Sequence, residues 1–184
     1  MTKRKSVVAG TLVLSALSFG VGVFFLMRKA ATMEKSAFPT MIGTTAPESV
    51  LKDIEGRIVT LSSFRGKPVV AILWASWCSF CKDELSNYVA VQREFLADDR
   101  EIVFLAIHRG EPAEQVGDIT RESGPDVSPV ILLSDRDDAL YRALNGFTMP
   151  ETLFIDQNGV IRGHYRQSMS AEELRRRIQN VFYL

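Results

Sequence analysis

Cysteine and histidine are both rare in this chain of 184 residues, which contains two of each. A structural zinc site normally needs four ligands of these two types. His108 and His164 are far in sequence from the cysteines, so we expect no bound metal. The scarcity of cysteine also directs attention to the place where both cysteines occur.

An excess of charge of one sign is also lacking, because 22 basic residues balance 22 acidic ones. Proteins that bind nucleic acid usually carry a basic excess, so we expect no nucleic-acid partner. Internal repeats and low-complexity tracts are absent as well. The length allows one domain of ordinary size plus an additional segment.

The additional segment is the N-terminus, where residues 6–27 carry no charge. As a helix this stretch would span roughly 33 Å, enough for the core of a bilayer. A cleavable signal peptide is the alternative, but its apolar part is usually shorter and a small-residue cleavage site follows it. Basic residues follow directly here, so we favour an uncleaved signal anchor in contact with membrane lipid. The basic residues at positions 3–5 place the N-terminus in the cytoplasm and the rest of the chain on the periplasmic side of the cytoplasmic membrane.

We therefore divide the chain into three parts. Residues 1–28 form a cytoplasmic stub and a transmembrane anchor, residues 29–37 form a tether, and residues 38–184 form the folded domain.

The two cysteines, Cys78 and Cys81, lie between a strand pattern and a helix pattern. Residues 68–74 are a short apolar run, and apolar residues recur at helical spacing over residues 85–96. A helix N-terminus favours a thiolate over a thiol, so a C-x-x-C sequence in this place is typical of a redox-active pair. The alternatives are a metal site and a structural disulfide, although so short a loop gives little entropic stabilisation.

The residues around the cysteines resemble a known family. The sequence Trp74-Ala75-Ser76-Trp77-Cys78-x-x-Cys81 is similar to the active-site motif of thioredoxin-fold proteins. The stretches Lys82-Asp83-Glu84 and Met149-Pro150-Glu151-Thr152 narrow the resemblance to membrane-anchored thiol:disulfide reductases of the TlpA/ResA type, which include those of cytochrome c maturation. The resemblance covers residues 38–182.

The resemblance implies a set of roles. Cys78 would be the nucleophile that forms a mixed disulfide, and Cys81 would resolve it. The redox-active disulfide Cys78–Cys81 would serve without any other cofactor. Pro150 would be the cis proline of the fold that faces this disulfide. The substrate groove would comprise Trp77, Ser79, Phe80, Met149 and Pro150.

Glu84 is the third predicted catalytic residue. It lies three residues after Cys81, on nearly the same face of the predicted helix. In the family that this chain resembles, a glutamate here exchanges protons with the second cysteine. Thioredoxins carry a buried aspartate on the preceding strand, where this chain has Ile72, so Glu84 is the obvious replacement. The alternative is an ordinary solvated helix residue.

The remaining patterns predict an α/β domain of thioredoxin-like fold, with a central mixed sheet flanked by helices. Strands are expected at residues 58–60, 102–107 and 130–133, and helices at 112–122 and within 135–145. Asn158-Gly159 predicts a hairpin, and Ser170 to Glu173 predicts the start of the last helix. His108, at a strand end, is more typical of a loop residue, and the acidic cluster 135–138 lacks the pattern of a calcium loop.

The sequence thus predicts an anchored thiol:disulfide oxidoreductase outside the cytoplasm. Its partners would be protein disulfides or dithiols, apocytochrome c among them, and a membrane electron donor. A peroxiredoxin-like peroxidase is one alternative, but Ala71 and Ala75 replace the proline and hydroxyl residue of that group. A copper-delivery module is another, but those proteins use C-x-x-x-C with a distant histidine, a role in which only His108 would serve.

Overall fold

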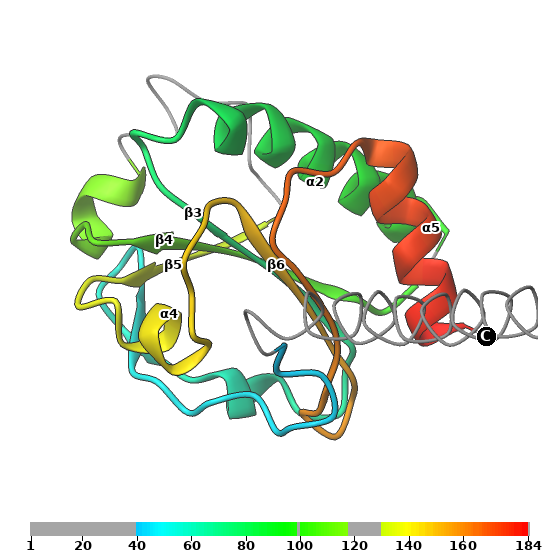
Figure 1. Cartoon of the computed structure of the whole chain (residues 1–184), viewed down its shortest axis with the longest axis horizontal. Coiled ribbons are helices and arrows are strands. Elements are labelled where there is room, and N and C mark those ends of the chain that lie inside the picture. The colour runs from blue at the N-terminus through cyan, green and yellow to red at the C-terminus, as the bar shows by residue number, and fades with distance from the viewer. Residues whose placement is uncertain (1–39, 99, 118–129, 184) are drawn as a thin grey trace, which may run out of the picture. The chain divides into compact units, whose positions relative to one another are not determined.

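A computed structural model describes residues 40–98, 100–117 and 130–183 (Figure 1). The predicted anchor and tether, and the first two residues of the predicted domain, lie outside these ranges. Within the described ranges, no helix is both long enough and apolar enough to cross a membrane.

The domain is built on one seven-stranded sheet with the strand order β2-β1-β5-β4-β3-β6-β7. Strands β3, β4 and β5 pair in parallel, whereas β1, β2, β6 and β7 pair antiparallel, so the sheet is mixed. The strands are β1 (Leu51–Asp53), β2 (Ile58–Val59), β3 (Val69–Trp74), β4 (Val103–Arg109), β5 (Ile131–Asp135), β6 (Glu151–Ile155) and β7 (Ile161–Tyr165).

Helices cover both faces of this sheet (Figure 1). Helices α2 (Ser79–Ala97) and α5 (Ala171–Phe182) pack on one face, and α4 (Ala139–Ala143) with the 3-10 helix η2 (Leu61–Phe64) packs on the other. Residues 113–117 are also helical. The rest of the helix predicted over residues 112–122 lies outside the described residues.

Strand β3 is central because all six of its side chains are buried. Successive side chains point to opposite faces of a strand, so β3 supplies both cores. Val70, Ile72 and Trp74 pack towards α2 and α5, and the intervening residues pack towards α4. A continuous apolar run in the sequence was therefore the correct signal for a strand covered on both sides.

Local signals explain the ends of several elements. The Ser170 hydroxyl oxygen accepts the N–H of Glu173 at 3.2 Å, which confirms the predicted start of α5. Asp156 accepts the N–H groups of Asn158 and Val160 in the predicted hairpin turn, and Gly159 takes a φ of 81° there. Asp135 is buried and accepts the N–H groups at the start of α4, so its carboxylate fixes a helix.

One expectation needs correction. His108 is not a loop residue: it belongs to β4, pairs with both neighbouring strands and is fully buried. A proline at the start of a strand belongs at a sheet edge or in a special turn, and Pro150 is not at an edge, because it precedes β6, which pairs on both sides. Pro150 instead occupies a special turn.

Candidate active site

The cysteines form a disulfide where β3 leads into α2. The bond joins Cys78 and Cys81 with an S–S distance of 2.05 Å and a Cα–Cα distance of 5.3 Å. Cys78 is the N-cap residue of α2, and its sulfur accepts the N–H of Cys81 at 3.2 Å. Such an N–H, together with the positive end of the helix dipole, stabilises negative charge on the Cys78 sulfur after reduction.

The two cysteine residues differ in exposure to solvent. Cys78 is 8% exposed and Cys81 is fully buried. The partial exposure of Cys78 agrees with the order of attack that the resemblance implied. The nucleophilic and resolving roles themselves remain predictions.

The segment before Cys78 is held by hydrogen bonds to β4 and to Glu111, which follows β4. The Nε2 atom of His108 accepts the backbone N–H of Ser76 at 3.0 Å, and the Ser76 hydroxyl donates to Glu111 at 2.5 Å. Trp74 packs edge-on against the His108 ring, with the ring centres 4.5 Å apart. Burial lowers the pKa of His108, an effect that the charge of Glu111 opposes. A lowered pKa favours the neutral ring that can accept the Ser76 N–H.

Glu84 is buried on α2, one turn beyond Cys81, and is only 1% exposed. The alternative of a solvated helix residue is therefore wrong. Burial raises the pKa of Glu84 from 4.5 to about 7, although hydrogen bonds from Ser168, the Met169 backbone and Thr152 lower it in part. The Thr152 hydroxyl, on β6, lies 3.3 Å from the carboxylate. A carboxyl group with this pKa can exchange a proton at neutral pH.

Two of the predicted groove residues, Trp77 and Phe80, lie beside Cys78 in sequence and bear exposed aromatic rings. Trp77 and Phe80, which flank Cys78, are 69% and 70% exposed, and Phe147 is also exposed. The Met149–Pro150 peptide bond is cis, as the resemblance implied. Exposed aromatic rings beside a reactive sulfur are suited to contact with an apolar polypeptide segment.

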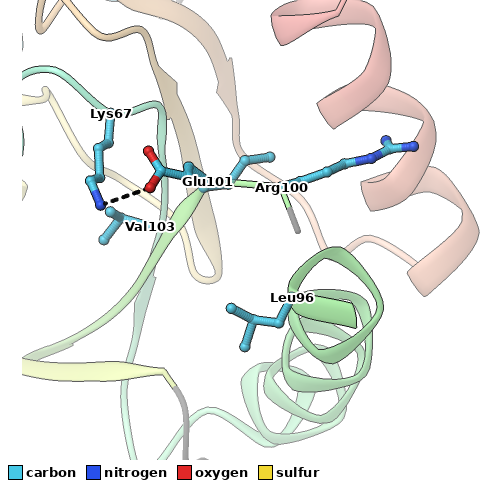
Figure 2. A pocket seen from close by; sticks show the side chains of 6 residues that line it. Lys67, Leu96, Arg100, Glu101 and Val103 are labelled. Atoms are coloured by element: carbon cyan, nitrogen blue, oxygen red, sulfur yellow. Dashed lines mark ion pairs between the residues drawn. The ribbon is translucent and has the colours of Figure 1, made fainter. Parts of the chain in front are cut away.

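A hollow of about 270 Å³ lies near the start of β4 and the end of α2, away from the disulfide. Figure 2 shows its lining at the start of β4 and the end of α2, with Lys67 paired to Glu101 at 3.6 Å. The cysteines lie at the other end of β3 and the other end of α2. This hollow is therefore remote from the redox chemistry.

Some residues near the active-site loop had no recognisable sequence signal. His108 contacts Ser76 across 32 residues of sequence, and Glu111 contacts it across 35. Only the register of β3 against β4, which pairs Trp74 with His108, brings them together. Among the described residues, no group of three or more histidine, cysteine or acidic side chains could hold a metal ion.

Comparisons with known proteins agree with this geometry. The chain is 29% identical over 185 residues to the thiol-disulfide oxidoreductase ResA of Geobacillus thermodenitrificans, covering 98% of this chain and 99% of the relative. It is 31% identical over 131 residues to ResA of Bacillus subtilis, covering 69% and 70% of the two chains. The thioredoxin domain of a thiol-disulfide oxidoreductase from Bacteroides vulgatus has the same fold, with a TM-score of 0.64 at 20% identity, covering 78% of this chain and 98% of that one.

The family model of the AhpC/TSA family matches residues 42–164, which contain both cysteines, Glu84 and Pro150. The relatives share the oxidoreductase name, and the Cys78–Cys81 disulfide supplies the corresponding chemistry. The chain is therefore a thiol-disulfide oxidoreductase with a thioredoxin-like fold and belongs to the AhpC/TSA family.

Proposed function

We propose that this oxidoreductase is anchored in the cytoplasmic membrane and reduces disulfides of extracytoplasmic proteins, apocytochrome c among them. The uncharged stretch 6–27, preceded by basic residues, supports the anchor and the orientation. The sequence resemblance to TlpA/ResA-type reductases supports the class of substrate.

The reaction proceeds in two exchanges. The Cys78 thiolate attacks one sulfur of the partner's disulfide, forms a mixed disulfide and releases one partner thiolate. The Cys81 thiolate then attacks the Cys78 sulfur, which forms the Cys78–Cys81 disulfide and releases the second partner thiolate. Two electrons pass to the partner, and a membrane dithiol donor returns two electrons to this protein. Glu84 accepts the Cys81 proton before the second attack.

The observation that carries the direction of this reaction is the buried carboxyl group of Glu84. A dithiol/disulfide couple becomes more oxidising when its reduced form is stabilised. A thiol with a strongly lowered pKa has this effect, because its thiolate is stable. A buried carboxylate one helical turn from Cys81 opposes formation of a thiolate. The start of α2 stabilises the Cys78 thiolate, whereas Glu84 disfavours the Cys81 thiolate. Our proposal takes the effect of Glu84 as the larger one, which makes the dithiol form a reductant.

The test combines a midpoint potential with a defined substrate. In full-length protein in detergent, we expect a potential nearer to thioredoxin, about −270 mV, than to the strong oxidant DsbA, about −120 mV. The reduced protein should also reduce an oxidised peptide with the Cys-x-x-Cys-His haem-attachment sequence. A midpoint potential near the DsbA value would contradict the proposed direction of the reaction. No reaction with this peptide would contradict the proposed substrate.

A further inference from the structure

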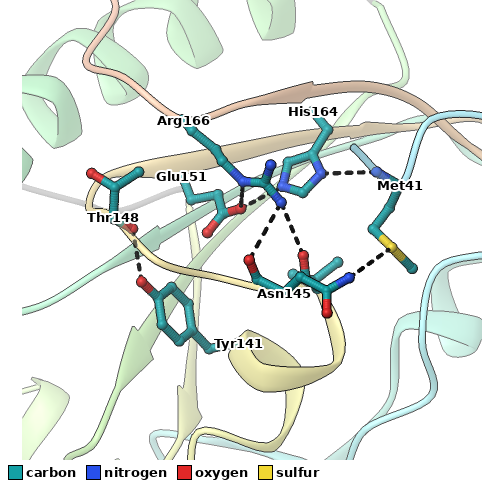
Figure 3. A network of polar contacts seen from close by, with 8 residues as sticks. Met41, Tyr141, Asn145, Thr148, Glu151, His164 and Arg166 are labelled. Atoms are coloured by element: carbon teal, nitrogen blue, oxygen red, sulfur yellow. Dashed lines mark hydrogen bonds and ion pairs between the residues drawn. The ribbon is translucent and has the colours of Figure 1, made fainter. Parts of the chain in front are cut away.

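A buried charged network lies directly after the cis peptide bond. Glu151 is the first residue of β6, follows Pro150 and is fully buried. Its Oε1 atom contacts two nitrogens, Nε2 of His164 and Nε of Arg166, the latter at 2.8 Å (Figure 3). Its other oxygen, Oε2, is buried without a hydrogen-bond partner in the described part of the chain. The two contacts to Oε1 therefore hold this carboxylate.

The position of the proton on His164 follows from its second contact. The backbone N–H of Met41 can only donate, and it points to Nδ1 of His164 at 3.2 Å. Nδ1 is thus the acceptor, so Nε2 carries the proton and donates to Glu151. Glu151 receives one N–H from a neutral ring and one from a guanidinium group. The arrangement satisfies each contacting nitrogen and links β6 to the start of the described chain.

Arg166 extends this network to the loop between α4 and β6. Its Nη2 atom lies 3.1 Å from the Leu144 carbonyl oxygen and 3.5 Å from that of Asn145. Its guanidinium carbon is 4.9 Å from the centre of the Phe147 ring. Arg166 therefore joins Glu151, at the far end of this loop, to the residues where the loop begins.

A separate contact holds the middle of the same loop. The Tyr141 hydroxyl, on α4, donates to the Thr148 carbonyl oxygen at 3.0 Å (Figure 3). Thr148 immediately precedes the cis Met149–Pro150 bond. Residues 144–150, which include exposed Phe147 and the predicted groove residues Met149 and Pro150, are thus attached at both ends and in the middle.

We propose that Glu151 is a positioning residue that, through Arg166, holds the 144–150 loop in the form that receives a polypeptide substrate. The inference rests on the proposed function in one respect, because it takes protein disulfides as the substrates. Glu151 touches neither sulfur in this scheme and leaves the chemistry of exchange unchanged. A small disulfide needs only access to Cys78, whereas a polypeptide must also lie along the loop.

The test compares two oxidants on the reduced, full-length protein in detergent. One is 5,5′-dithiobis(2-nitrobenzoate), a small disulfide, and the other is insulin, a protein disulfide. Glu151→Gln keeps the volume of the side chain but removes its charge, so the ion pair between Glu151 and Arg166 is lost. We expect the rate constant with insulin to fall about tenfold, and the rate constant with the small disulfide and the midpoint potential to stay unchanged.

Two further variants guard against simple unfolding. Tyr141→Phe removes only the bond to Thr148 and should lower the insulin rate in the same direction by a smaller factor. Arg162→Gln is the matched control, because Arg162 is an exposed β7 residue paired with Asp156 and should leave both rates unchanged.

The outcomes separate this inference from the proposed function. Equal insulin rates for parent and Glu151→Gln, or parallel falls with both oxidants, would overturn the positioning role. A parent protein that reacts with the small disulfide but never with insulin or the haem-attachment peptide would instead refute protein reduction itself, and the inference with it. A selective loss with insulin in Glu151→Gln and Tyr141→Phe supports the inference.

Discussion

Glu84 is the residue whose environment most affects the chemistry of the site. It lies on α2 at the spacing that brings it over Cys81, and its burial raises its pKa from 4.5 to about 7. In the folded protein the carboxyl group keeps its proton to a higher pH than in the unfolded chain. Folding and proton binding at Glu84 are therefore linked.

This linkage predicts how the free energy of unfolding changes with pH in the parent protein relative to Glu84→Gln. Because the folded pKa is the higher one, the stabilising contribution is complete below about pH 4.5 and is lost as the pH rises to about 7. Across this range, the free energy of unfolding of the parent should fall by up to about 3 kcal/mol relative to the variant. Urea unfolding at a series of pH values measures this difference.

The control is Glu94→Gln, on the exposed side of the same helix, where Arg175 lowers the pKa of the carboxyl group instead. It should not reproduce the effect over this pH range. Parallel pH profiles for the parent and Glu84→Gln would contradict the assigned pKa.

Site residues could be predicted from the sequence when their partners lie close to them along the chain. Cys78, Cys81 and Glu84 could be grouped because a single helix fixes their spacing. Pro150 could be placed only through the family resemblance, since its sequence reads as an ordinary strand start. His108 and Glu151 could not be assigned, because partners such as Ser76 and Arg166 lie just beyond the ends of other strands and are placed by sheet register.

Among the elements, the turn from β3 into α2 depends most on contacts from elsewhere. Cys78 begins α2, but the position of the preceding turn is set by His108 on β4, which accepts the Ser76 N–H. The apolar runs predicted β3 and β4 correctly because both strands are buried on two sides. They gave no information on how the connecting turn is held.

His108→Phe tests this support. The variant keeps a ring of similar size against Trp74 but leaves the Ser76 N–H without its acceptor. The Ser76 N–H is part-buried, and a fully buried unpaired donor costs about 1–3 kcal/mol, so the free energy of unfolding of the oxidised protein should fall by up to that amount.

Ser76→Ala is the comparison, because it removes only the hydroxyl bond to Glu111 and should cost about 1 kcal/mol or less. Urea unfolding of the three proteins gives the order. Stability of His108→Phe equal to that of the parent would show that the turn does not need this acceptor.

At the scale of the whole chain, the role proposed for the N-terminal stretch rests on sequence alone. Residues 40–184 form one compact unit. The predicted anchor lies outside the described residues, so its support remains the uncharged run 6–27 and the flanking basic residues. The hydrophobicity of an apolar run predicts contact with the membrane, but it does not predict which residues the run packs against.

The proposed topology predicts the outcome of protease digestion of intact spheroplasts. Protease added outside should remove the domain from residue 40 onward, while a cytoplasmic marker protein stays intact. Digestion after detergent lysis provides the control that both proteins can be cleaved. Full-length protein that survives until lysis would place the domain on the cytoplasmic side.

In the proposed reaction, Cys78 attacks protein disulfides and Cys81 resolves the product. The most direct measurement is trapping of the mixed disulfide, with the full-length Cys81→Ala and Cys78→Ala variants in reduced form, each mixed with the oxidised haem-attachment peptide. Mass spectrometry then locates the bound peptide. We predict a stable adduct on Cys78 in Cys81→Ala and no comparable adduct in Cys78→Ala, because Cys78 is the more exposed cysteine and lies at the start of α2. An adduct that forms faster on Cys81 in Cys78→Ala, or none in either variant, would contradict the account.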